Sequence, residues 1–207
     1  MKIFFIRHGD TDYRTLDTRG VRGWARSFAP LSPMGRVQID VIANDYRLQE
    51  AEAILSSSYA RALESAALLN RKLNKPMYVE YDLHEWLPNK DSLSDLDDVS
   101  AQKAYEEFRY YTGFDGYVGK ELKPKTPPPP EGRTWESLEE VRERALKALR
   151  RYKHLSSVIV VSHAVLIASV IGVPRAIQHA EIIPFEIDLE ADTPLGVRPV
   201  KPMKRYP

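Results

Sequence analysis

Short runs of apolar residues alternate with amphipathic segments along most of the chain, and this alternation predicts its fold. Five apolar-rich runs predict strands, at residues 2–6, 53–56, 77–81, 157–161 and 182–189. The runs at 2–6 and 157–161 are continuously apolar, which is typical of strands buried on both faces of a sheet. The tail after Asp192 contains proline and lysine and is expected to be irregular.

Between these runs, apolar residues recur at helical spacing and predict helices at 33–49, 59–73, 136–153 and 164–171. Ser32 stands at the expected N-cap of the first of these helices, and Pro33 at its first helical position. Strands that alternate with helices imply crossover connections and a parallel sheet. We therefore predict an α/β fold with three layers, α/β/α, and a mostly parallel central sheet with helices on both faces. A chain of 207 residues is most simply one domain, over residues 1–207.

Residues 88–130 interrupt the alternation with a polar, acidic and aromatic segment, expected to be helical at 99–111. Four prolines at 127–130 predict an extended, stiff connector; the alternative is a ligand for a proline-binding domain. We expect this insertion to form a lid over one edge of the sheet and over the functional site. Its aromatic residues either line an apolar pocket or form a small core of the lid. They are Trp86, Phe108, Tyr110, Tyr111, Phe114 and Tyr117.

Composition narrows the class of protein. Hydrophobic residues make up 43% and charged residues 29%, as in ordinary globular proteins. The net charge of +1 argues against bulk binding of nucleic acid. The chain has no cysteine, which excludes disulfides, thiolate nucleophiles and cysteine-based zinc sites. The first apolar run is too short for a signal peptide, and no stretch approaches the ~20 apolar residues of a membrane span. A cytoplasmic monomer or homodimer is the expectation.

Charge is unevenly distributed along the chain. Residues 1–36 carry seven Lys or Arg against three Asp, which can attract an anionic substrate. Residues 91–107 carry six acids against Lys103, which is typical of a solvated helical face.

Several reactive side chains follow predicted strands. Arg7 and His8 follow the first strand, and Ser57 to Arg61 follow the second. Glu85 comes soon after the third, and His163 directly follows SVIVV. In open α/β sheets the functional crevice lies at the carboxyl ends of the strands, so these side chains can meet at one rim.

Five blocks in the same order carry a family resemblance: IRHGDT, LSPMGRVQ, SSSYARALESA, LHEW and VVSHAVLI. They resemble the motifs of the histidine phosphatase superfamily, also called phosphoglycerate mutase-like, over about residues 2–173. The resemblance implies that His8 is the nucleophile that becomes a phosphohistidine and that Arg7 and Arg61 clamp the phosphate. It also implies that His163 is a second pocket histidine and that Glu85 donates a proton to the leaving oxygen, although Asp82 lies nearby.

These residue types suit phosphoryl transfer, which depends on positioning and on neutralising charge at the equatorial oxygens. Guanidinium groups stay charged and bind phosphate through paired donors. Adjacent arginines favour the neutral imidazole that attack requires. The arginines then take the part that a metal ion plays elsewhere, so we expect no metal and no cofactor. His84, His154 and His179 lack a motif and are interpreted as structural or surface residues.

The sequence departs from the family pattern at a few positions. Arg14 stands where many members have a phosphate-contacting Asn, and it either adds a cation to the pocket or turns outward. Asp10 replaces Glu, Ser65 replaces Thr, and Ala164 replaces Gly after the second histidine. Residues 132–134 read Gly-Arg-Thr where many members have Gly-Glu-Ser/Thr, which weakens a mutase interpretation.

The function that follows is a metal-independent phosphomonoesterase that uses a phosphohistidine and acts on an unidentified small phosphorylated substrate. Two alternatives stay open. One is a mutase of the phosphoglycerate mutase type that returns the phosphoryl group to another hydroxyl. The other is a domain that binds a phosphorylated ligand without turnover.

Overall fold

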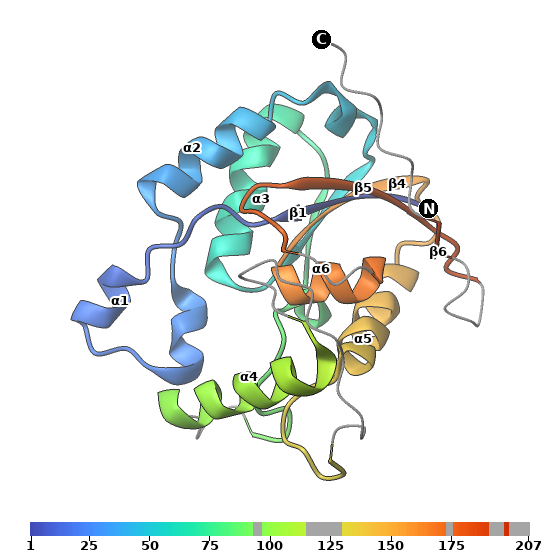
Figure 1. Ribbon diagram of the computed structural model, residues 1–207. Coiled ribbons are helices and arrows are strands. Elements are labelled where there is room, and N and C mark those ends of the chain that lie inside the picture. The colour runs from blue at the N-terminus through green and yellow to red at the C-terminus, as the bar shows by residue number, and fades with distance from the viewer. Residues whose placement is uncertain (93–96, 115–129, 173–175, 191–196, 199–207) are drawn as a thin grey trace.

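A six-stranded sheet forms the middle layer of the computed structural model, which describes residues 1–92, 97–114, 130–172, 176–190 and 197–198 (Figure 1). The strands in chain order are β1 (Lys2–Arg7), β2 (Ala53–Ser57), β3 (Met77–Glu80), β4 (Ser157–Ser162), β5 (Ile182–Ile187) and β6 (Val197–Arg198). Their order across the sheet is β3-β2-β4-β1-β5-β6. The first four of these are parallel to one another, whereas β5 and β6 are antiparallel to their neighbours. The prediction of a mostly parallel sheet is confirmed.

Helices cover both faces of the sheet (Figure 1). The α-helices are α1 (Arg14–Thr18), α2 (Pro33–Ile42), α3 (Ala60–Leu73), α4 (Asp98–Thr112), α5 (Leu138–Arg150) and α6 (Ala164–Ile171). Three short 3-10 helices are η1 (Gly23–Phe28), η2 (Tyr46–Glu50) and η3 (Tyr81–Leu83). Helices α2 and α3 lie on one face, and α5 and α6 on the other, with α4 outside them. The predicted three-layer α/β/α fold is confirmed.

The opening strand shows why central strands are continuously apolar. Ile3 and Phe5 point into the core shared with α5 and α6, whereas Phe4 and Ile6 point into the core shared with α2 and α3. Each of these side chains is at most 1% exposed. Burial of a large apolar side chain contributes about 1.5–3 kcal/mol, so both cores stabilise the strand that carries Arg7 to the rim.

Two sequence predictions require correction. The helix expected over 33–49 ends at Ile42, because Asp45 begins η2 by accepting a hydrogen bond from the Arg47 N–H. The apolar residues at helical spacing in this range included Val37 and Val41, but both are exposed, and Ile39 is buried instead. The tail expected to be irregular contains β6, which pairs with β5 through Glu186–Arg198 and Ile187–Val197.

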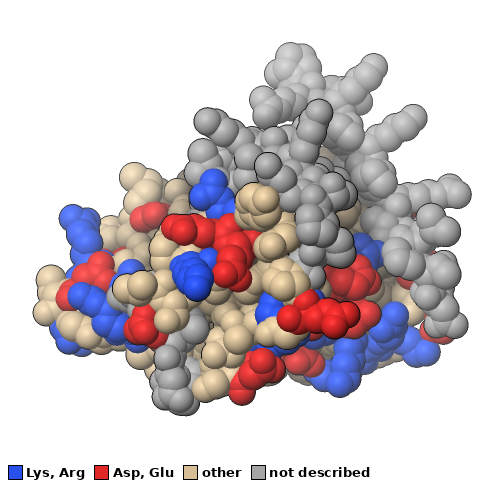
Figure 2. All heavy atoms as spheres, turned by 60° about the horizontal axis from the view of Figure 1, so that its bottom comes forward, with Lys and Arg blue, Asp and Glu red and all other residues tan. Residues whose placement is uncertain are grey.

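The insertion contains the expected helix, as α4, with Asp97 as its N-cap. Phe108 and Phe114 do not form a separate lid core. Both belong to the apolar cluster on the sheet face that α5 and α6 cover. Tyr110 is exposed, and Tyr117 lies outside the described residues, as do three of the four prolines. On the face that includes α4, basic and acidic side chains are interspersed over the described residues (Figure 2).

Among the described residues, no helix is both long and apolar enough to cross a bilayer.

Candidate active site

The ends of β1 and β4 bring two histidines together. The parallel register sets Arg7 opposite Ser162, so that His8 and His163 both follow the ends of adjacent strands. Their ring centroids are 5.1 Å apart, and both side chains are buried. Together with Arg7 and Arg61 they form what we call the rim site. The prediction that these four residues can meet at one rim therefore agrees with where the structure places them.

His8 is held in one tautomer. Its Nδ1 lies 2.8 Å from the carbonyl oxygen of Gly9, an acceptor only, so Nδ1 carries the proton. Its Nε2 accepts a hydrogen bond of 3.1 Å from the Nε–H of Arg61. Burial, followed by the nearby charges of Arg61 and Arg7, lowers the pKa of His8 well below its ordinary value. The side chain is thus a neutral imidazole whose lone pair on Nε2 faces a cation.

The two arginines come from different elements. Arg61 lies in the first turn of α3 and stacks its guanidinium over the Tyr59 ring at 4.9 Å. Arg7 ends β1 and donates from a terminal nitrogen to the carbonyl oxygen of Ile177 at 2.5 Å. Both side chains are buried, and the two positive charges lie against two imidazoles that burial keeps neutral. Buried cations in this arrangement favour an anion.

The two ring nitrogens of His163 differ in their contacts among the described residues. Its Nε2 lies 2.8 Å from the Oγ of Ser57, at the end of β2. Its Nδ1 is buried and has no hydrogen-bond partner among the described residues. Burial and the charge of Arg61 lower the pKa of His163 well below its ordinary value. A buried polar atom without a partner costs free energy unless a ligand satisfies it, so Nδ1 of His163 is available to a ligand.

The loop after His8 is fixed against the start of α2. A Cβ atom added at Gly9 would lie 2.5 Å from the carbonyl oxygen of Gly35, and one at Gly35 would overlap the carbonyl oxygen of Asp10. The glycines of two sequence blocks are therefore needed for one close backbone contact.

Polar groups complete this junction. The Oγ of Ser32 donates to Asp10 Oδ2 at 2.5 Å while it accepts from the Gly35 N–H, and Gln38 accepts from the Asp10 N–H at 2.8 Å. Ser65 on α3 accepts from the Gly9 N–H at 3.1 Å. The Ser32 N-cap predicted from the sequence is confirmed, and the Ser65 hydroxyl makes the backbone contact that fixes Gly9.

Glu85 lies at the amino end of α6. Its carboxyl oxygens accept from the backbone N–H groups of Trp86 at 3.0 Å, Leu166 at 3.3 Å and Val165 at 3.4 Å. The amino end of a helix attracts an acidic group through its free N–H groups and dipole. Asp82, the neighbouring alternative, instead pairs with Arg151 at 3.0 Å. The sequence offered both Glu85 and Asp82 as candidate acids, and the structure gives the two carboxyls different partners.

A buried ion pair holds the segment that carries Glu85. Arg144 on α5 forms a two-point pair with Glu136, with distances of 2.7 and 2.9 Å. The same guanidinium donates to the carbonyl oxygens of Asp82, His84 and Glu85, and Glu136 accepts from the Leu87 N–H. Neither Arg144 nor Glu136 belongs to a motif in the sequence, so pattern reasoning missed this support.

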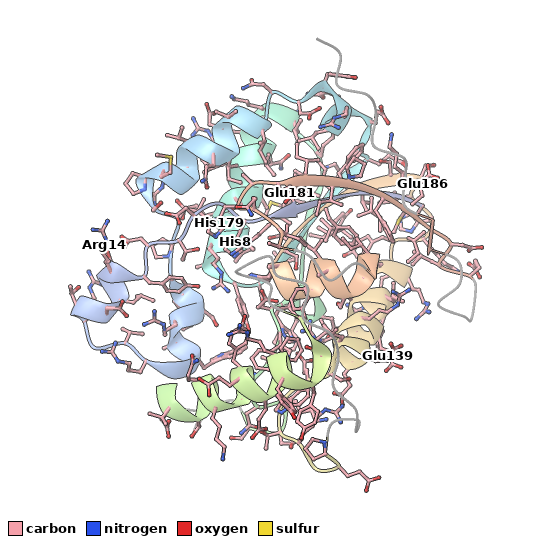
Figure 3. The ribbon with its side chains drawn as sticks, in the orientation of Figure 1. His8, Arg14, Glu139, His179, Glu181 and Glu186 are labelled. Carbon is pink, nitrogen blue, oxygen red and sulfur yellow. The ribbon has the colours of Figure 1, made fainter. Side chains whose placement is uncertain are left out.

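Arg14 does not join the rim site. It is the first residue of α1, is exposed, and points away from His8 (Figure 3). Of the two orientations considered from the sequence, the structure shows the outward one.

His179 does join it, although it lacks a motif. Its ring centroid is 5.5 Å from that of His8, and the two side chains lie side by side in Figure 3. The interpretation of His179 as a structural or surface residue therefore does not account for its position. His154 is exposed, as that interpretation predicted. His84 is buried and faces Tyr59, with ring centroids 6.2 Å apart.

A cavity of about 460 Å³ opens beside the rim site, and we call it the side pocket. Arg61, which contacts His8, lines it together with Glu85, and its walls come mainly from η1, from residues 85–92 and from α4. Four aromatic side chains line it: Trp24, Tyr59, Trp86 and Tyr105. The sequence left open whether Trp86 lines a pocket or belongs to a core of the lid, and the structure places it both in the lining and in the core cluster. Sequence patterns carried no signal for Trp24, because η1 has no periodic pattern. No group of three metal-ligating side chains among the described residues is arranged to hold a metal ion.

The sequence was compared with protein-family models and with curated proteins. The family model for the histidine phosphatase superfamily, branch 1, matches residues 3–198. No curated protein matches the chain significantly.

Solved structures share the fold. YhfR from Bacillus stearothermophilus is 20% identical with a TM-score of 0.61, and the match covers 90% of this chain and 91% of that one. A mycobacterial glucosyl-3-phosphoglycerate phosphatase is 20% identical with a TM-score of 0.61, covering 95% of both chains. The α-ribazole phosphatase of Shigella flexneri is 21% identical with a TM-score of 0.57, covering 91% of both. At these identities the likeness establishes the fold.

Proposed function

The chain belongs to the histidine phosphatase superfamily, and we propose that it is a phosphomonoesterase that works through a phosphohistidine on His8. The observation that carries the proposal is the state of His8. Its Nδ1 is fixed on the Gly9 carbonyl, and its Nε2 lone pair faces Arg61 in a buried pocket. A neutral, oriented imidazole among cations is what nucleophilic attack on a phosphate dianion requires.

The first half of the reaction follows from this geometry. The phosphate of the ester binds between Arg7, Arg61 and the unsatisfied Nδ1 of His163. Arg61 then exchanges its hydrogen bond with His8 for one with a phosphate oxygen. His8 Nε2 forms a bond to phosphorus as the bond from phosphorus to the ester oxygen breaks. Glu85 gives its proton to the departing oxygen, so the alcohol leaves neutral.

The second half returns the enzyme to its starting state. Water enters on the side that the alcohol has left and loses a proton to the Glu85 carboxylate. Its oxygen bonds to phosphorus as the bond from phosphorus to Nε2 breaks, which releases inorganic phosphate. His163 and the two arginines stabilise the charge on the equatorial oxygens in both halves, without a metal in either step.

The closing test is a phosphatase assay in the presence of a chelator. Purified protein should release inorganic phosphate from p-nitrophenyl phosphate, and His8→Ala should abolish that release. His154→Ala, which alters an exposed histidine, serves as the matched control and should retain full activity. Activity that survives in His8→Ala would overturn the assignment of the nucleophile.

Two other results would redirect the proposal. Isomerisation of a phosphoglycerate without net phosphate release would identify a mutase. Binding of phosphorylated ligands without turnover of any monoester would identify a binding module.

A further inference from the structure

The side pocket lies where the alcohol part of a substrate must lie, and its lining therefore selects the substrate. Arg61 of the rim site also lines the pocket, and Glu85 lines it as well. Under the proposed function, Arg61 holds the phosphate and Glu85 protonates the ester oxygen. The carbon skeleton attached to that oxygen then extends into the side pocket.

Aromatic side chains from separate segments line this cavity. Trp24 of η1 and Tyr59 contact each other edge to face, with centroids 5.4 Å apart. Trp86 makes a second edge-to-face pair with Tyr105, which lies on α4, and their centroids are 5.9 Å apart. A cavity of about 460 Å³ is in the range that holds a compact organic ligand. Aromatic walls stabilise flat rings by stacking and edge contacts.

Among the described lining residues, the charged side chains are Arg61, Glu85 and Arg26. The Arg26 guanidinium forms an ion pair with Asp17 and stacks over the Tyr13 ring at 4.8 Å. The remaining polar lining residues are neutral: Ser27, Asn89, Ser92 and Gln102. The lining thus suits an uncharged group with a few hydrogen-bonding atoms better than a second phosphate or a carboxylate.

We propose that the substrate is a phosphomonoester whose alcohol carries an uncharged aromatic or heteroaromatic ring, such as a nucleoside monophosphate. This inference rests on the proposed function. It makes phosphoglycerates poor substrates, because the cations among the described lining residues are Arg61, which holds the phosphate, and Arg26, which is already paired with Asp17.

Matched substrate pairs test the proposal without changing the chemistry of the leaving oxygen. 2-Phenylethyl phosphate is compared with propyl phosphate, and adenosine 5′-monophosphate with ribose 5-phosphate, by kcat/KM. We expect a preference of roughly tenfold or more for the ring-bearing member of each pair. Trp24→Ala and Tyr105→Ala should remove most of that preference and leave the ring-free substrates nearly unaffected.

Two matched controls lie on the same elements and outside the lining. Phe28→Ala on η1 and Tyr110→Ala on α4 alter exposed side chains and should preserve the preference. Equal rates for both members of each pair, or equal losses on both in Trp24→Ala, would overturn the substrate class. Absence of phosphate release from every ester would instead overturn the proposed function.

A second inference rests on the loop that carries His179. The Ala180 N–H donates to the Arg7 carbonyl at 3.0 Å, and the Ile177 carbonyl accepts from the Arg7 side chain. Ala180 adopts a left-handed conformation with φ of 57°, which is costly for a residue with a Cβ. The loop is thus fastened to Arg7 in a strained form that sets the neighbouring side chain over His8.

The loop places the His179 ring beside the ring of His8, on which the phosphoryl group forms under the proposed function. The Nδ1 of His179 lies 3.8 Å from Asp10 Oδ1. Burial, followed by the charge of Arg7, lowers the pKa of His179 to about 4 against the opposing effect of Asp10. A neutral imidazole here has one N–H to donate to a phosphoryl oxygen.

We infer that His179 is a further phosphate-binding residue, one that donates a hydrogen bond to the phosphoryl group on His8. The inference rests on the proposed function and is tested with orthovanadate and inorganic phosphate as inhibitors. His179→Leu should weaken both by about tenfold, whereas His179→Asn, which keeps an N–H donor, should restore most of the affinity.

Gln178→Ala, in the same loop with an exposed side chain, is the control for disturbance of the loop. Its inhibition constants should match those of the unaltered protein, and all three variants should keep the same midpoint of thermal unfolding. Unchanged inhibition in His179→Leu, or an equal loss in Gln178→Ala, would overturn this role.

Discussion

The rim site and the side pocket adjoin each other, yet they are built in different ways. Residues of the rim site lie at strand ends or at the start of a helix, and hydrogen bonds to backbone and side-chain groups fix His8 and Gly9. The side pocket is lined by side chains from a short 3-10 helix, a loop and an inserted helix. Under the proposed function, residues at the ends of the strands carry out the chemistry, and the segments around the sheet select the alcohol.

Glu85 lies between the two regions, and its loss should have the largest effect that depends on the substrate. Glu85→Gln cannot donate a proton, so kcat/KM for an alkyl ester should fall by about 10²–10⁴. The fall for p-nitrophenyl phosphate should be much smaller, because p-nitrophenolate leaves without a proton. Asp82→Asn is the matched control and should keep both rates. Equal losses on the two esters would contradict the assignment of Glu85 as the proton donor.

Arg61 lines the side pocket, but under the proposed function its charge acts on the phosphoryl group in the rim site. Arg61→Gln should lower kcat/KM by about 10²–10³ for ring-bearing and ring-free substrates alike, because it removes one charged donor from the phosphoryl oxygens. Steady-state kinetics on the matched substrate pairs measure this. A loss confined to ring-bearing substrates would place Arg61 in the side pocket alone.

The backbone contact between Gly9 and Gly35 should matter for the rim site and not for the side pocket. Gly35→Ala adds a Cβ that overlaps the Asp10 carbonyl, so the loop after His8 must shift. We expect a loss of about 1–3 kcal/mol in the free energy of unfolding, and slower phosphate release. The preference for ring-bearing substrates should persist. Met34→Ala, at an exposed neighbouring position, should change neither quantity.

The sequence predicts the residues at strand ends better than the residues that loops place. Arg7, His8, Arg61 and His163 are found from motifs that lie at or just after the ends of strands, and parallel strand ends meet at one edge. Glu85 could not be separated from Asp82, since only the position of the α6 amino end distinguishes them. His179 and Trp24 carry no local signal, because the folding of a loop and of η1 places them. Arg14 matches a motif position, but α1 begins there and turns it outward.

The buried histidines near both regions should lower the free energy of unfolding in acid. This effect is smaller than the effects of the substitutions described above. Burial lowers the pKa of His84 and of His179 to about 4, and that of His8 and His163 well below the ordinary value, so the unfolded chain takes up protons that the folded chain does not. Stability should therefore decline as pH falls from about 6.5 towards 4, by up to ~1.4 kcal/mol per pH unit for each histidine.

Urea unfolding at several pH values measures this decline. His84→Gln should make the dependence on pH shallower by about one proton, whereas His154→Gln should leave it unchanged. An identical slope in His84→Gln would contradict the burial of a neutral imidazole behind Tyr59.

The central claim is that His8 carries the phosphoryl group, and trapping the intermediate tests it most directly. The protein is mixed with a labelled monoester, quenched within milliseconds in base, where a phosphohistidine persists, and digested for mass spectrometry. The account predicts a phosphoryl group on the peptide that contains His8, formed before inorganic phosphate appears and absent in His8→Ala. Phosphate release from the unaltered protein with no labelled His8 at any quench time would contradict it.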